Sequence, residues 1–250
     1  SIGTDIAPFV NVTIANIEDI TLVSNTGIGV TGAINMSTWG ATSVDATNTI
    51  AGAVNLTSPA TAAVTASNTA AAAMTLTGGL SHTATSTGGA LTLLTSAGAI
   101  VSTLAAQAAN AVVINSGTSV THTSTGQTTG VVGVGAVTAG QTAPTGAVTV
   151  TTTGNYSDGA NLTLGAITVR GGTSNTITTA TGVTAAETLV AVTDTGTDTV
   201  NMGAITVTGL ATTTDATITQ PNAVTKTNGV VAVAAVTETS TITMEALTAT

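Results

Sequence analysis

The chain has 250 residues, of which 5% are charged, 1% aromatic and 42% hydrophobic, and its formal net charge is −9. Two basic residues in all exclude a phosphate-tracking nucleic-acid surface and binding to anionic lipid, and the absence of cysteine excludes disulfides and thiolate metal sites. Scarce charge with abundant Thr, Val and Ile also excludes disorder, and indicates an ordered chain that is nearly all β.

Residues 1–31 are predicted to form a lead-in with strands over Val10–Ile14 and Asp19–Val23, because apolar and polar residues alternate there. The segment between them ends in the neighbouring acids Glu18 and Asp19, which would point to opposite faces of a strand. We therefore do not expect them to act as a catalytic carboxylate pair. No signal peptide is visible, and we interpret the chain as a mature product or a segment of a longer one.

From residue 32 onward, a five-residue pattern recurs at intervals near 19 residues. Each copy starts with a small residue, and the second and fourth residues after it are apolar. Such a period is typical of a solenoid coil rather than of separate domains, so residues 32–250 are predicted to form one continuous domain. The copies are Gly32–Met36, Gly52–Leu56, Ala72–Leu76, Gly89–Leu93, Asn110–Ile114, Gly130–Val134, Gly146–Val150, Gly165–Val169 and Gly203–Val207.

Alternation within each copy predicts an inner face of apolar residues, such as Val54 and Leu56, and an outer column of polar ones, such as Asn55. A second strand is expected about ten residues later, at 42–46, 62–66, 119–122 and 175–178. The fold class is therefore predicted as an all-β, parallel β-solenoid (β-helix) with coils of about 19–20 residues. General crossover preference makes it right-handed, and roughly a dozen coils would stack at ~4.8 Å per strand.

The repeat register weakens between Thr184 and Met202 and again after Pro221, where a bulge or an inserted loop would explain the slip. Residues 99–110 are the only candidate for a helix, and their phase also suits a coil. A row of immunoglobulin-like sandwiches is the competing fold. The short period and the lack of aromatic residues speak against it.

Few residues offer chemistry. His82 and His122 are expected at polar column positions two coils apart, too far to share a metal. Asp194 and Asp198 lie in a stretch that resembles half of the calcium-binding nonapeptide of RTX β-rolls, with Gly196 and Asp198 matching its Gly-x-Asp step. They are either a solvated turn or a weak calcium site. No other cofactor and no enzymatic activity is expected.

Residues Ile17–Glu18, Ile20–Val23 and Gly32–Gly40 resemble a recurrent piece of bacterial surface-layer and RTX-type adhesin-like proteins. The likeness covers 9–45, and the rest of the chain resembles that family only in composition and period. The resemblance implies an extracellular, self-assembling surface protein, as a lattice or filament subunit. The chain departs from the family in lacking tandem Gly-Gly-x-Gly-x-Asp calcium repeats.

The expected partner is another copy of the chain, joined end to end through uncapped terminal coils near 10–23 and 230–244. No membrane insertion is expected, because no apolar run approaches ~20 residues. One alternative is an adhesin stalk that holds a binding tip away from the cell, and a cell-surface glycan is the alternative partner. Another is ice binding by outward Thr-x-Thr pairs, although Thr92/Leu94 and Thr168/Arg170 interrupt the array. The pairs are Thr75/Thr77, Thr149/Thr151 and Thr206/Thr208.

Overall fold

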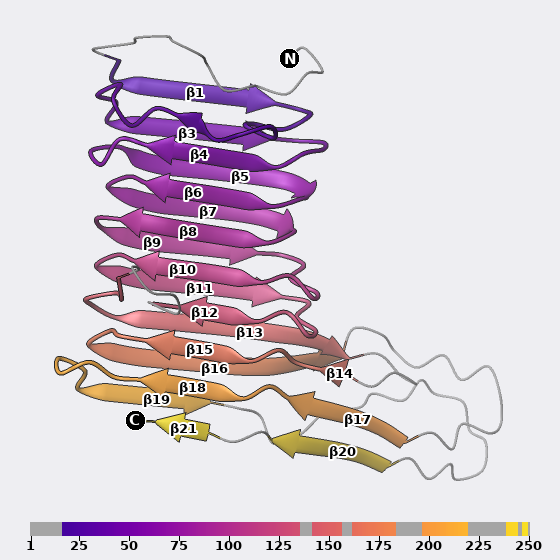
Figure 1. Ribbon diagram of the computed structural model, residues 1–250. Coiled ribbons are helices and arrows are strands. Elements are labelled where there is room, and N and C mark those ends of the chain that lie inside the picture. Colours follow the sequence, from indigo (N-terminus) through magenta and orange to yellow (C-terminus); the bar gives the residue numbers. More distant parts are fainter. Residues whose placement is uncertain are drawn as a thin grey trace.

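The computed structural model describes residues 17–135, 142–156, 162–183, 197–219, 239–244 and 247–249. Every regular element in these residues is a β-strand, and no helix occurs among them. The prediction of an all-β chain is confirmed. Most strands belong to two nine-stranded sheets, which overlie each other in Figure 1 with their strands running in opposite directions.

The first sheet is the longer-stranded of the two and begins near the N-terminus. In spatial order it contains β1 (Asp19–Ser24), β3 (Ser43–Asn48), β5 (Ala63–Ala71), β7 (Ser81–Gly88), β9 (Ala99–Leu104), β11 (Ser119–Thr125), β13 (Val148–Tyr156), β16 (Ser174–Val183) and β19 (Asp215–Thr219). The second strands predicted at 42–46, 62–66, 119–122 and 175–178 all fall in this sheet.

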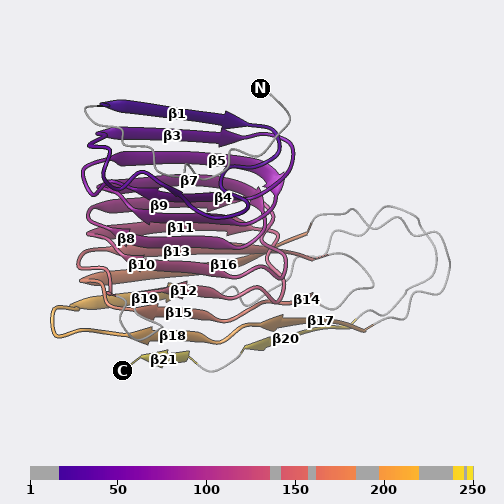
Figure 2. The ribbon, with the colours of Figure 1, turned by 45° about the horizontal axis from the view of Figure 1, so that its top comes forward.

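The second sheet contains β2 (Ile34–Asn35), β4 (Val54–Ser58), β6 (Met74–Gly78), β8 (Leu91–Ser96), β10 (Val112–Ser116), β12 (Val132–Val134), β15 (Ile167–Arg170), β18 (Ile205–Thr208) and β21 (Leu247–Ala249). A third sheet has three strands, β14 (Leu162–Thr163), β17 (Thr197–Met202) and β20 (Thr239–Met244). Figures 1 and 2 both place the third sheet to one side of the stack, near its C-terminal end.

All pairings between these strands are parallel. Two parallel neighbours need a crossover between them, and here the crossover is itself a strand. From β1 to β13 the chain alternates between the first and second sheets, and from β13 onward it visits the first, third and second sheets in turn. Each such turn of the chain, here called a passage, therefore adds one strand to every sheet that it visits.

The core lies between the two large sheets, whose inner positions form one buried apolar cluster. The inward column predicted from the repeat is confirmed, since each of its residues from Ile34 to Val150 is at most 1% exposed. Valine, isoleucine and leucine fill this narrow space because alternate residues of every strand face the same side. The column contains Ile34, Met36, Val54, Leu56, Met74, Leu76, Leu91, Leu93, Val112, Ile114, Val132, Val134, Val148 and Val150.

Three expectations about the order of the repeats are wrong. The copy at Gly146–Val150 lies in the first sheet, where Val148 pairs with Val120, and not in the second sheet with the other copies. The copies at Gly165 and Gly203, about two periods apart, occupy neighbouring strands, because Ile167 pairs with Ile205. The intervening residues include β17, so the longer interval corresponds to a passage with a third strand rather than to a missing coil. Most of the slip in register expected between Thr184 and Met202 falls on residues 184–196, which lie outside the described residues, and the slip expected after Pro221 also begins outside them.

The third error concerns the first copy. Ile34 pairs with Leu56, two residues further along than the repeat alignment predicts, and Ile28 takes the place opposite Val54. A shift of two residues keeps Ile34 on the inner face, whereas a shift of one would have exposed it. Each large sheet also has nine strands among the described residues, fewer than the dozen coils expected.

Residues 99–110, the one helical candidate, form β9 followed by a turn. The corners between strands use glycine where the chain must turn back tightly against its neighbour. Gly52 has a φ of +85°, and a Cβ at this position would collide with the Thr26 carbonyl group of the preceding passage. Only glycine accommodates both the left-handed backbone and this close approach.

Candidate functional site

The last strand of the first sheet, β19, leaves its inward positions open. Ala216 is exposed and Ile218 is half-buried, whereas Asn175 and Ile177, their partners on β16, are fully buried. No described residue covers these two inward positions, so within the described part of the chain the inner face of the stack is open here. At the opposite end, β1 pairs with β3 alone among the described strands.

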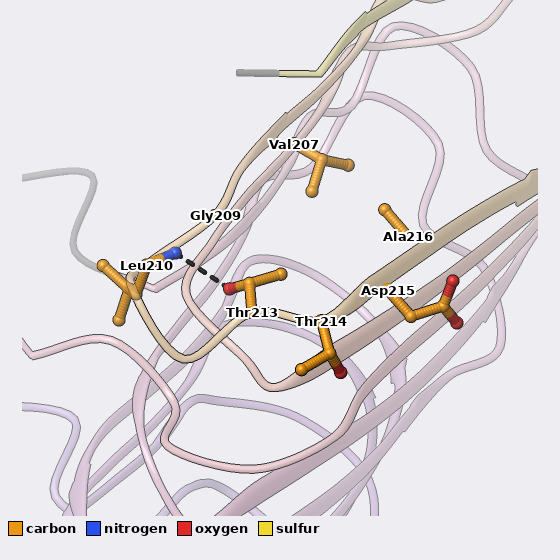
Figure 3. Close-up of a pocket in the computed structure, with 7 residues that line it drawn as sticks. All are labelled: Val207, Gly209, Leu210, Thr213, Thr214, Asp215 and Ala216. Atoms are coloured by element: carbon orange, nitrogen blue, oxygen red, sulfur yellow. Dashed lines mark hydrogen bonds between the residues drawn. The ribbon is translucent and has the colours of Figure 1, made fainter.

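A hollow of about 470 Å³ lies beside β19, in the turn that joins it to β18 (Figure 3). Thr213 fixes this turn, because its hydroxyl accepts a hydrogen bond from the Leu210 amide at 2.8 Å and donates one to the Gly172 carbonyl at 2.6 Å. Asp215 is the only ionisable residue among the described residues that line the hollow. The lining residues are Val207, Gly209, Leu210, Thr213, Thr214, Asp215 and Ala216.

The two histidines point into the core, which corrects the expectation that they occupy exposed polar columns. His82 on β7 is 1% exposed and His122 on β11 is 0% exposed. They lie in different inner columns, since His82 stands beside Val64 and Ile100 and His122 beside Ser102 and Val150. They therefore do not form a shared metal site.

Burial controls the protonation of both rings. Desolvation lowers the pKa of His82, and a hydrogen bond between its Nε2 and the Gly78 carbonyl partly opposes that shift. Burial alone lowers the pKa of His122 to about 4. Both rings are therefore neutral near pH 7, as expected for imidazoles in an apolar interior.

Ser102 and His122 form the only serine–histidine hydrogen bond of the described residues, with 2.9 Å between Oγ and Nδ1. A nucleophilic serine needs a base, a third group that orients the base, and access to substrate. The other ring nitrogen of His122 has no partner, and Ser102 is 2% exposed. The pair therefore satisfies a buried polar group and cannot serve as a catalytic centre.

Buried amides line one edge of the core. Asn48 Nδ2 donates to Asn68 Oδ1 at 2.9 Å and to the Gly52 carbonyl at 2.8 Å, so it links two successive passages of the chain. Gln107 and Gln127 both donate to the Gly130 carbonyl, at 3.2 Å and 2.8 Å. These bonds occupy corner carbonyls that the strand ladders leave open, which is a structural role.

The candidate calcium residues are not brought together by any described contact. Asp194 lies outside the described residues, and Asp198 lies in β17, where only the backbone is described. Within the described residues, no group of three or more histidine and acidic side chains could hold a metal. Glu18, just before β1, and Asp19, its first residue, are both exposed.

Two of the predicted Thr-x-Thr pairs, Thr75/Thr77 and Thr206/Thr208, lie on the outer face of the second sheet, and their side chains are half-buried. Leu94 and Arg170 interrupt this array, as expected. The third pair, Thr149/Thr151, lies on the outer face of the first sheet. The repeat pattern places this pair on the same face as the other two, so the regular array to which it belongs was not predicted.

That array, here called the threonine face, consists of two outward columns that cross all nine strands of the first sheet. Seven of the nine positions in each column are threonine. The first column is Thr21, Asp45, Thr65, Thr83, Val101, Thr121, Thr149, Thr176 and Thr217, and the second is Val23, Thr47, Ser67, Thr85, Thr103, Thr123, Thr151, Thr178 and Thr219.

Comparison with protein-family models, curated proteins and solved structures finds no match to this chain. None of the described segments forms a helix that is long and apolar enough to cross a membrane. The candidate sites therefore rest on geometry alone: the open end at β19 and the threonine face.

Proposed function

We propose that the chain is a right-handed parallel β-solenoid that acts as a self-assembling structural protein of a bacterial cell surface, without catalysis. In this proposal, successive copies join end to end, with β19 of one copy beside β1 of the next. The surface-layer and RTX-like character of residues 17–40 supports the location. In this proposal, the fold of the described part of the chain does not depend on calcium.

The open inner face of β19 is the observation that carries the proposal. Every inner strand of the first sheet has a neighbour on each side that continues its backbone ladder and covers its apolar residues. Among the described strands, β19 has a neighbour on one side only, and its inward residues Ala216 and Ile218 are exposed and half-buried. An added strand would continue the backbone ladder beyond β19 and bury these side chains, as in β-strand addition.

Charge at the two ends opposes this joining. In a stack that continued the register, Asp215 of β19 would stand beside Asp19 of the next copy, because each is the first residue of its strand. Like charges on neighbouring strands are destabilising, and charged residues are a common protection of open edges. Assembly is therefore expected to be conditional, and to strengthen when this repulsion is removed.

Substitutions of opposite expected sign test the proposal. Asp215→Asn should increase association, because it removes the like-charge contact, and Ile218→Lys should abolish it, because a lysine would have to be buried at the joint. Thr103→Lys, on an exposed position in the middle of the same sheet, is the matched control and should assemble as the parent does. Light scattering and negative-stain microscopy measure the association.

Equal assembly of the parent and Ile218→Lys would contradict joining through β19. Folded rods that never associate, even with Asp215→Asn, would also contradict it and would favour the adhesin-stalk alternative. Circular dichroism must first establish that each variant keeps the β signal of the parent.

A further inference from the structure

The threonine face is regular in two dimensions. Neighbouring threonines within a column are one strand apart, at ~4.8 Å, and the two columns are two residues apart along the strand, at ~6.7 Å. The pairings are in register from β1 to β19 without a shift at these positions. In Figures 1 and 2 the strands of this sheet are stacked with little rotation, so the face is close to flat.

The hydroxyls of this face are available. Within the described residues, no hydrogen bond engages the side-chain oxygen of any threonine in the two columns, and none of these positions is fully buried. Threonines at the corners of the chain behave differently. Thr61 donates to the Ala41 carbonyl at 3.0 Å, and Thr69 donates to the Thr49 carbonyl at 2.5 Å. The corner hydroxyls thus hold successive passages together, whereas those of the face do not.

The composition of the face excludes most macromolecular partners. Asp45 is the one charged residue in the two columns, so the face offers nothing to phosphate or to an anionic membrane. No aromatic side chain is present to stack on a sugar ring. As a strip about nine strands long and two columns wide, it offers on the order of 500 Å², below the roughly 800 Å² per partner of a stable protein interface.

We propose that the threonine face binds ice. Its methyl groups order the water above them because they cannot hydrogen-bond to it, and its hydroxyls can enter the ordered layer as donors and acceptors. The spacing between strands, ~4.8 Å, and the spacing between the two columns, ~6.7 Å, are close to oxygen–oxygen repeats of hexagonal ice. One ordered layer of water can therefore match many threonines at once. This periodic match distinguishes ice from a protein partner, whose surface is irregular.

The test is thermal hysteresis of the full chain, together with the shape of ice crystals grown in its presence. The parent should lower the freezing point below the melting point and facet the crystals. Thr121→Lys places a long charged side chain in the middle of the face and should abolish most of the hysteresis. Thr75→Lys is the matched control on the outer face of the second sheet and should retain it.

Two results would overturn the proposal. One is a parent protein without hysteresis or crystal shaping, including a parent that is instead retained by crystalline chitin or cellulose. The other is an equal loss in Thr121→Lys and Thr75→Lys when circular dichroism finds both folded. End-to-end association is measured separately by light scattering, so failure of this proposal and failure of the proposed assembly are distinguishable.

Discussion

Substitution of Val54 by aspartate tests whether this side chain of β4 faces the core. Val54 is 0% exposed and stands between Met74 on β6 and Ile28 on the other side. The substitution loses about 1.5–3 kcal/mol of apolar burial. A carboxylic acid without a hydrogen-bond partner costs about 1–3 kcal/mol more even when it stays neutral.

Together these terms amount to roughly 2.5–6 kcal/mol, a large share of the 5–15 kcal/mol typical of a whole domain. Asn55→Asp changes the next residue, which faces outward and is half-buried, and should alter the free energy of unfolding by less than about 0.5 kcal/mol. Urea titrations followed by far-ultraviolet circular dichroism provide both values. Similar losses in the two variants would refute the account of inner and outer faces.

Three further predictions concern buried polar groups and metal. The pKa of His122 is about 4 in the folded chain against 6.5 as its ordinary value, so the unfolded state binds more protons between these values. The free energy of unfolding should therefore fall by about 3 kcal/mol as the pH drops from 6.5 to 4. His122→Gln should flatten this pH dependence in urea titrations at several pH values. An unchanged pH dependence in that variant would contradict burial of the ring. Asn68→Ala should cost about 1–3 kcal/mol, because it removes the side-chain donor to the Ala72 carbonyl and the acceptor of Asn48 Nδ2. A neutral result in the same titration would mean that water replaces the amide. A chelator should leave the circular dichroism spectrum unchanged, whereas a loss restored by calcium would point to Asp194 and Asp198.

The inward and outward residues of each strand could be predicted from the sequence, because apolar and polar residues alternate within the strand itself. Ile34 keeps its inward position even though its pairing is displaced by two residues. Burial on one side of a strand depends on a period of two, and such a displacement leaves that period intact. The inner column was therefore predictable without knowledge of the neighbours.

The sheet to which a strand belongs could not be predicted in the same way. Gly146–Val150 has the alternation and the leading small residue of the other copies, yet it pairs with β11 in the first sheet. Strands of both sheets carry apolar residues at alternate positions, so the pattern does not distinguish them. The third strand added after β13 then doubled the apparent period between Gly165 and Gly203.

The threonine face and the histidines were missed for a related reason. A column forms between residues about 20 positions apart, and its composition becomes visible only when the register is known. His122 suits an inner position because Ser102 of the preceding strand supplies a hydrogen bond. Thr121 and Thr149 are neighbours although 28 residues separate them, which is longer than the expected period of about 19 residues.

Disulfide trapping can detect end-to-end joining of two copies without background, because the chain contains no cysteine of its own. In an end-to-end stack, Thr21 of one copy and Thr217 of the next would occupy adjacent positions of one column, at ~4.8 Å, a separation that a disulfide can bridge. In the Asp215→Asn background, which removes the like-charge contact at the joint, the variant with Thr21 and Thr217 both replaced by cysteine should form a ladder of covalent dimers, trimers and longer species under oxidising conditions. A control with cysteines at Thr75 and Thr217 should remain monomeric, because Thr75 lies on the other sheet. Covalent multimers in neither variant, or equally in both, would contradict assembly through β19 and β1.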